Sequence, residues 1–394
     1  MFQRSHHQLL TTRLKEPRRF IQVVLGPRQV GKSTLVEQVV RSVDLPHLSV
    51  SADGTGAASP DWLEQQWEAA RLMKSSRGVP VFLLVIDEIQ KITNWSETVK
   101  RNWDADTRAG IEIRVVLLGS SRILIHDGLT ESLAGRFETI FMGHWTYTEM
   151  QSAFDVDLDR YVWFGGYPGA AALMHDEPRW KAYVRDALIE TSISKDILMM
   201  TRVDKPMLMR RLFELGCLHS AQILSFNKML GQLQDARNTV TLSHYLHLLD
   251  MAGLLCGIEK YAEQLIRLRS SSPKFQVHNT AIIAAQRHET LLIARTDGTH
   301  WGRCVESAAG AHLINDSMAG GYRVSYWRER NAEIDFVLER AGEVIGIEVK
   351  SNHEAQTPGM KAFMDRFRPK RMLLVGPAGL PLEEFLKIRP VDLF

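Results

Sequence analysis

The chain has 394 residues, of which 45% are hydrophobic and 24% are charged, and its net charge is +2. This composition predicts a soluble globular protein of two to four domains, and it neither requires nor excludes a polyanionic partner. Cys217, Cys256 and Cys304 form no C-x-x-C pair, which argues against a disulfide framework or a zinc cluster and favours the reducing cytoplasm. The N-terminus lacks a signal-peptide core and the longest apolar run, 79–86, is too short to cross a bilayer, so we expect no membrane segment.

Residues 21–36, IQVVLGPRQVGKSTLV, combine an apolar strand pattern, a glycine loop and an amphipathic helix. Gly26, Gly31, Lys32 and Ser33 fill the fixed positions of G-x-x-x-x-G-K-[ST], whose backbone N–H groups and lysine bind polyphosphate while the serine holds Mg²⁺. The helix dipole favours the same anion, and this context disfavours an ordinary glycine turn. We therefore predict an ATP–Mg²⁺ site formed by Gly26, Pro27, Arg28, Gln29, Val30, Gly31, Lys32, Ser33 and Thr34.

A second nucleotide signature follows a short strand at 47–50 and a helix at 61–74. The run VPVFLLVIDEIQ at 79–90 is typical of a buried parallel strand that delivers Asp87 and Glu88 to its carboxyl end. Phosphoryl transfer depends mainly on positioning and charge stabilisation. We therefore expect Asp87 to hold Mg²⁺ through water and Glu88 to orient the attacking water.

Two further elements resemble parts of an ATPase site. A helix at 95–108 precedes a strand at 113–118 that ends in Gly119, Ser120 and Ser121. One of these serines, not separable from the other, is expected to sense the γ-phosphate; the alternative is a strand-ending turn. In SLAGRF, Arg136 follows a glycine, where it is either a finger that neutralises transition-state charge in a neighbouring subunit or a surface salt bridge.

The motifs GPRQVGKST, LLVIDEIQ, LLGSS, LAGRF and GGYPG, in this order, resemble the AAA+ ATPases of a large bacterial and archaeal family related to signal-transducing ATPases. Its members carry a C-terminal domain of unknown function, and the resemblance covers essentially the whole chain. It implies nucleotide roles for Lys32, Ser33, Asp87, Glu88 and a serine of the 120–121 pair, a trans-acting role for Arg136, and a ring-like homo-oligomer. The segment FMGHW at 141–145 departs from the pattern, because a proline-containing turn is expected there.

The middle of the chain follows a winged-helix order. Helical patterns at 207–217, 226–233 and 243–255 precede strands at 254–259 and 274–277, which flank a wing at 262–273. The third helix would then enter a major groove. Candidate contacts to bases and phosphates are Asn238, Thr239, Thr241, His244, Arg267 and Arg269. Few basic residues lie on this helix, so a winged helix used for packing or subunit contact is an equal alternative.

The C-terminal region predicts a second site. Alternation over 332–339 places Glu333, Asp335 and Val337 on one face of a strand, and after a turn at 341–342 the strand 344–350 places Glu348 and Lys350 on one face. A helix at 301–314 carries Glu306, and a helix at 360–367 and a strand at 372–375 follow. This order with D…E-x-K resembles the PD-(D/E)XK restriction-endonuclease-like fold.

The chemistry of that fold requires metal ions. Glu306, Asp335 and Glu348 would bind one or two Mg²⁺ ions that activate water, and Lys350 would stabilise the charge of the phosphorane. The alternative is an exposed hairpin on which Glu348 and Lys350 merely pair. Folds of this kind are also retained as inactive binding modules.

We therefore expect an α/β protein of four parts: a P-loop AAA+ parallel-sheet ATPase module at 1–160, a helical lid at 161–205, a winged helix at 206–278 and a restriction-endonuclease-like α/β domain at 279–394. Two functions are consistent with it. One is an ATP-driven protein that handles DNA, with C-terminal domains that bind or cut it. The other is a regulatory ATPase switch whose C-terminal domains are protein-interaction modules without nuclease activity.

Overall fold

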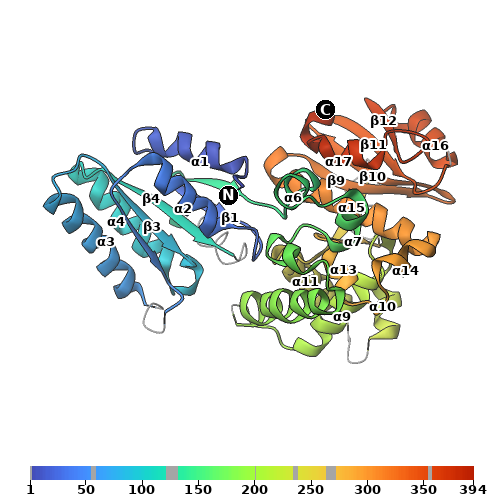
Figure 1. Ribbon diagram of the computed structural model, residues 1–394, viewed down its shortest axis with the longest axis horizontal. Helices are drawn as coiled ribbons and strands as arrows, with labels where there is room; N and C mark the ends of the chain where they lie inside the picture. Colours follow the sequence, from blue (N-terminus) through green and yellow to red (C-terminus); the bar gives the residue numbers. More distant parts are fainter. Residues whose placement is uncertain are drawn as a thin grey trace. The chain divides into compact units, whose positions relative to one another are not determined.

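The chain forms two compact units, Met1–Met142 and Gly143–Phe394, in a computed structural model (Figure 1). The structure describes residues 2–54, 59–120, 132–199, 201–233, 238–262, 272–353 and 357–394, so Ser121, Arg267 and Arg269 lie outside the described residues. The division into four domains stays a prediction, because compactness separates two units only. No described helix is long and apolar enough to cross a membrane.

The first unit is built on a five-stranded parallel sheet in the order β2-β3-β4-β1-β5. Parallel strands need crossover connections, and helices provide those that join the first four strands along the chain. The strands are β1 (Ile21–Leu25), β2 (His47–Ser51), β3 (Phe82–Asp87), β4 (Ile113–Gly119) and β5 (Phe137–Phe141); the helices are α1 (His6–Lys15), α2 (Lys32–Val43), α3 (Pro60–Ser76) and α4 (Trp95–Ala109). β1 is buried at all five positions, as its continuous apolar sequence predicts.

Helices cover both faces of this sheet (Figure 1). On one face, Trp67 of α3 and Trp103 of α4 pack in a core cluster with Val23 of β1. On the other, Leu10 of α1 and Val39 of α2 pack in a second cluster with other strand side chains. Because both faces are buried, the carboxyl ends of the strands and the loops that follow them remain available for chemistry.

The second unit begins with helices α6 (Tyr147–Phe154), α7 (Leu158–Phe164) and α8 (Glu177–Ala182). Helix α8 continues as two π-helical segments, Tyr183–Ile189 and Ser192–Leu198. The three cysteines are free and buried.

A seven-stranded sheet follows, in the order β12-β11-β10-β9-β7-β8-β6. Its strands are β6 (Gln222–Ile223), β7 (Leu255–Lys260), β8 (Lys274–Val277), β9 (Arg323–Glu329), β10 (Ala332–Arg340), β11 (Glu343–Val349) and β12 (Arg371–Val375). Helix α9 (Pro206–Leu218) precedes β6, and helices α10 (Phe226–Gln232) and α11 (Thr239–Met251) lie between β6 and β7. Helix α11 thus starts and ends four residues earlier than the third helix predicted at 243–255. Leu254 and Leu255 continue the apolar pattern, but Gly253, with φ 71°, ends the helix and Leu255 begins β7.

The predicted helix, strand, strand, strand, helix, strand order is present as α15 (Gly298–Gly320), β9, β10, β11, α16 (Pro358–Phe367) and β12. β10 and β11 form the predicted hairpin, and its turn residues Ala341 and Gly342 have φ values of 49° and 84°. Two short helices, α13 (Ala281–Ala285) and α14 (Leu291–Thr296), precede α15. Helix α17 (Leu382–Lys387) follows β12.

One predicted face is wrong. The register between β10 and β9 shifts between Ile334 and Val337, which is a β-bulge. A bulge inserts a residue and breaks the two-residue alternation, so Val337 does not share a face with Asp335. Val337 instead packs with Ile334 and with Phe363 of α16 in one core cluster.

Candidate functional site

The phosphate loop of the first unit has the backbone shape that its glycines allow. Gly31 has φ 89° and Gln29 has φ 62°, both in the left-handed region. A Cβ atom at Gly26 would lie 2.1 Å from the carbonyl oxygen of Met142, so only glycine fits where the chain leaving β5 approaches the loop. These constraints give the loop one tight path from β1 into α2.

Lys32 is the first residue of α2, and it is only 8% exposed. Its Nζ donates hydrogen bonds to the carbonyl oxygens of Gly26 (2.9 Å) and Pro27 (2.8 Å). The ammonium therefore lies against the loop. The first N–H groups of a helix have no intrahelical partner, so the start of α2 also offers donors to an anion.

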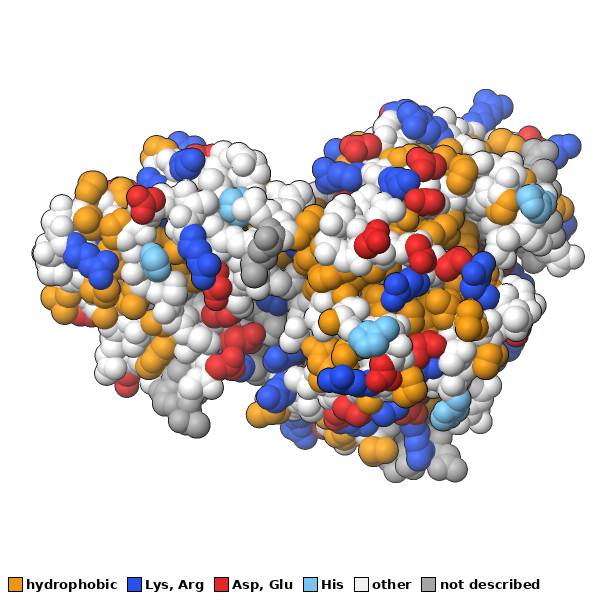
Figure 2. Space-filling view, in the orientation of Figure 1, with side chains coloured by type: hydrophobic (Ala, Val, Ile, Leu, Met, Phe, Trp, Pro, Cys, Tyr) orange, Lys and Arg blue, Asp and Glu red, His pale blue; other side chains and the backbone are white. Residues whose placement is uncertain are grey.

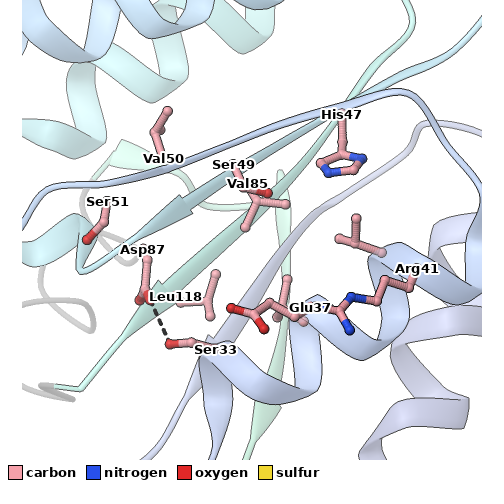
Figure 3. Close-up of a pocket in the computed structure, with 12 residues that line it drawn as sticks. Ser33, Glu37, Arg41, His47, Ser49, Val50, Ser51, Val85, Asp87 and Leu118 are labelled. Atoms are coloured by element: carbon pink, nitrogen blue, oxygen red, sulfur yellow. Dashed lines mark hydrogen bonds between the residues drawn. The ribbon is translucent and has the colours of Figure 1, made fainter.

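Two hard oxygen ligands meet beside this loop. Ser33 Oγ donates a 2.7 Å hydrogen bond to Asp87 Oδ2 at the end of β3 (Figure 3). The other carboxylate oxygen, Asp87 Oδ1, accepts from the backbone N–H of Glu88 at 2.8 Å. The predicted Mg²⁺ residues Ser33 and Asp87 are thus brought together, and their oxygen donors are the type that Mg²⁺ prefers.

The backbone of Glu88 adopts a left-handed conformation. Its φ of 54° is unusual for a non-glycine residue, which indicates backbone strain imposed by the surroundings. Its Oε2 accepts hydrogen bonds from Ser120 Oγ at 3.2 Å and from Gln90 Nε2. Gln90 Nε2 also lies 3.1 Å from Ser120 Oγ, so three side chains form one small network. The structure therefore joins the predicted water-orienting residue to Ser120, one of the two candidate sensors.

Gln90 is a site residue that sequence reasoning missed. It is 5% exposed and lies in a short 3₁₀ helix, Ile89–Lys91, directly after the two acids. The signal was its position in IDEIQ, three residues after Asp87, where one helical turn returns a side chain to the same side. No described residue donates to its Oε1, which is buried.

A cavity of about 470 Å³ adjoins Ser33 and Asp87 (Figure 3). It runs along α2 to Arg41 and is lined on the strand side by His47 and Ser49 of β2. The polar side chains on this face of β2 match its half-exposed burial pattern, as expected for the last strand of the sheet.

Arg136 has an ion-pair partner within its own chain. Its Nε lies 2.8 Å from Asp104 Oδ1 and its Nη2 lies 3.0 Å from Asp104 Oδ2, in a bidentate arrangement. The hydrogen bond from Arg136 lowers the pKa of Asp104. The single chain thus contains the salt bridge that was the alternative interpretation, and the role in a neighbouring subunit stays a prediction.

In the second unit, the predicted C-terminal residues converge. Lys350 Nζ lies 3.0 Å from Glu348 Oε1, and Asp335 Oδ2 accepts from the backbone N–H of Val349 at 2.8 Å. Asp335 and Glu348 are 8% and 4% exposed, so the alternative of a solvent-exposed hairpin pair does not hold. Glu306 of α15 joins the same cluster by an ion pair with a residue that was not predicted to belong to the site.

That residue is Lys274, the first residue of β8, which is fully buried. Its Nζ forms an ion pair with Glu306 Oε1 and lies 3.3 Å from Asp335 Oδ1 and 3.1 Å from the carbonyl oxygen of Asp335. Burial opposes its charge, but Glu306 and Asp335 outweigh burial and raise its pKa. Sequence reasoning used this lysine only as the start of a strand.

The carboxylates of the cluster are destabilised by each other and by burial. Burial and the charge of Asp335 raise the pKa of Glu306 to about 8. The same two causes raise the pKa of Glu348 to about 7, against the opposing effect of Lys350. Strongly perturbed groups gathered in one place are typical of functional sites, although structural ion-pair networks produce them too.

Comparisons with known proteins agree with the first site. An AAA domain model matches residues 18–151, and two models of domains of unknown function, DUF8612 and DUF4143, match residues 155–291 and 301–385. No curated protein matches the chain.

Three solved structures that resemble the chain do so distantly. The Orc1 protein of Aeropyrum pernix in complex with DNA is 14% identical, with 73% of this chain and 91% of that chain covered and a TM-score of 0.31. Two substituted forms of RuvB from Thermotoga maritima are each 16% identical, with 64% of this chain and 85% of each of those chains covered and a TM-score of 0.33. At these scores the likeness carries no argument. The loop geometry, the paired Ser33 and Asp87 and the AAA domain match lead to one conclusion: the chain is an ATPase with an AAA-type domain in its first unit.

Proposed function

We propose that the chain couples ATP–Mg²⁺ hydrolysis in its first unit to binding of DNA by its second unit. The observation that carries the DNA-binding part is the order of elements from α9 to β8. Helix α9, strand β6, helices α10 and α11 and strands β7 and β8 follow one another, and the three strands pair in the antiparallel order β7-β8-β6. This order agrees with that of a winged helix, whose wing would lie between β7 and β8.

The proposed hydrolysis uses five side chains of the first unit. Lys32 would exchange its loop carbonyl bonds for phosphate oxygens, and Ser33 and Asp87 would hold Mg²⁺, which neutralises charge on the β- and γ-phosphates. Glu88 would leave its hydrogen bonds to Ser120 and Gln90 and orient the attacking water. Ser120, once released, would donate to the γ-phosphate. The Glu88 network therefore serves as a resting position of the catalytic carboxylate.

Assembly is the next part of the proposal. Arg136 is paired with Asp104 by two hydrogen bonds, and side chains of this pair are about one-third exposed. Exposed ion pairs contribute about 0–1 kcal/mol, so a neighbouring subunit's nucleotide can draw the guanidinium away at low cost. This supports a trans-acting arginine in a homo-oligomer, in which neighbouring subunits share each site.

Helix α11 would be the element that contacts DNA. Its exposed residues are Val240, Ser243, His244 and His247. Two of the predicted contact residues have local roles instead: Asn238 Oδ1 caps the helix by accepting from the backbone N–H and the hydroxyl of Thr241. His244 and His247 are therefore the side chains best suited to reach bases or phosphates.

A second candidate function is the regulatory switch, and the charge of α11 favours it. The sequence of this helix, TVTLSHYLHLLDM, contains no Lys or Arg, although phosphate contacts dominate DNA affinity. On the face in Figure 2, basic and acidic side chains of the second unit are interspersed. A winged helix with such a surface is suited to a protein partner.

Salt-dependent binding separates the two candidates. Fluorescence anisotropy of the full chain with labelled single-stranded, duplex and branched DNA should show an affinity that falls steeply with salt, because phosphate contacts release counterions. ATP hydrolysis should rise when DNA is added. His244→Glu should weaken binding, whereas the control His288→Glu, the same change at an exposed residue outside α11, should not. Absence of binding to all three DNA forms, with and without ATP, favours the switch.

A further inference from the structure

The carboxylate cluster of the second unit has a cation built into it. Lys274 Nζ contacts Glu306 Oε1 and Asp335 Oδ1, so one ammonium bridges the two carboxylates that were expected to share a metal ion. It also donates to the main-chain carbonyl of Asp335 at 3.1 Å. A divalent ion between acidic side chains makes contacts of the same kind, with carboxylate and carbonyl oxygens.

The lysine cannot move aside easily. Its side chain is completely buried, and Nζ lies 4.7 Å from the centre of the Phe336 ring. Its backbone is fixed by β8, where Lys274 is paired with Ile223 of β6 and with Ile258 of β7. A surface lysine leaves an ion pair by rotating into water, but this one has no exposed rotamer to take up.

Four of the six carboxylate oxygens are already engaged. Asp335 uses Oδ1 toward Lys274 and Oδ2 toward the N–H of Val349. Glu306 uses Oε1 toward Lys274, and Glu348 uses Oε1 toward Lys350. No described residue donates to Glu348 Oε2, which is buried. With the second oxygen of Glu306, it leaves two carboxylate oxygens for Mg²⁺, and an ion bound to them would lie beside the fixed ammonium of Lys274.

Charge disfavours a metal as well. Three carboxylates and two ammonium groups carry three negative and two positive charges, which leaves at most one net negative charge. A divalent ion would turn that into a net positive charge next to a fixed ammonium. Isolated charge in a buried site is strongly unfavourable. The residues present therefore do not fit a resident Mg²⁺ ion.

We propose that Lys274 is the permanent cation of this cluster, in the place between Glu306 and Asp335 where a metal ion would sit. The C-terminal site then holds its carboxylates together without a divalent ion and does not hydrolyse phosphodiesters by a metal-dependent route. This inference does not require the second unit to bind DNA, so it stands or fails separately from the proposed function.

Mn²⁺ binding tests the proposal on the full chain without nucleotide. Asp87→Asn is included in every variant, because Asp87 is an expected ligand in the ATP site. Titrations followed by electron paramagnetic resonance measure bound Mn²⁺ per chain. With the cluster intact, we expect no bound Mn²⁺ that depends on Glu306 or Glu348. Lys274→Met should create one such site per chain, and Mn²⁺ should then raise the thermal unfolding midpoint of that variant.

Lys350→Met is the matched control, since it removes the neighbouring ammonium but leaves Lys274 between Glu306 and Asp335; it should create no Mn²⁺ site. The proposal is overturned if the chain with an intact cluster binds Mn²⁺ and Glu348→Gln or Glu306→Gln removes that ion. It is also overturned if Lys350→Met alone creates the site. If Lys274→Met does not fold, the titration of the intact cluster with these two glutamine variants still decides, because it needs no change at Lys274.

Discussion

Glu88→Gln is the substitution that tests the first site most directly. The amide keeps the size of the carboxylate, and its oxygen can still accept from Ser120 and Gln90, so the network need not break. The change in unfolding free energy should therefore stay within about 1 kcal/mol, the usual net value of one hydrogen bond. What is lost is the charge that orients and polarises water.

Loss of such a group costs roughly 10²–10⁴-fold in rate, or about 3–5 kcal/mol in the activation barrier. ATP turnover should fall by this factor, while the affinity for a fluorescent ATP analogue stays within about twofold because Lys32 and Ser33 are unchanged. Glu37→Gln is the control: Glu37 lines the adjoining cavity and is exposed, and its substitution should leave turnover intact. Hydrolysis by Glu88→Gln at the parental rate would refute the assignment.

Three further predictions concern Lys32 and Arg136 of the first unit and Glu306 of the second. Lys32→Ala should abolish nucleotide binding in equilibrium dialysis, because it removes the ammonium held at the loop; retained binding would contradict the role. If Arg136 acts across subunits, activity per chain should rise with protein concentration and mixing Arg136→Ala with Glu88→Gln chains should restore hydrolysis, whereas concentration-independent turnover would exclude it. The folded-state pKa of Glu306, about 8, lies above its ordinary value of 4.5, so its contribution to stability should be present below pH 4.5 and be lost as pH rises through about 8. Urea unfolding from pH 4 to 9 should show this loss, and Glu306→Gln should reduce it; an unchanged pH slope would disprove it.

The first site could be predicted closely because its signals are local. Gly26, Gly31, Lys32 and Ser33 lie within eight positions of one another, and an apolar strand places the acids of β3 at the same end of the sheet. The partners of these residues were less accessible. The hydrogen bonds of Glu88 to Ser120 and of Arg136 to Asp104 each join residues 32 positions apart, and no local pattern specifies such pairs.

The second site was predicted only in part. The order of strands and helices and the convergence of Asp335, Glu348 and Lys350 follow from alternation and a hairpin turn. The bulge in β10 did not follow, because a strict two-residue period contains no signal for an inserted residue. Lys274 was missed for a different reason: lysine is almost never fully buried unless it is paired, and its partners lie on other elements.

Lys274 also bears on how the second unit is divided. It lies on β8, in the part predicted as a winged helix, whereas its charge partners lie on α15 and β10, in the part predicted as nuclease-like. β7 and β9 pair in parallel, so the sheet runs without interruption from one part to the other. Breaking a buried ion pair by removing one partner costs about 3–5 kcal/mol, which is a large share of the stability of a typical domain. Because this cluster spans the shared sheet, we expect the two parts to unfold together.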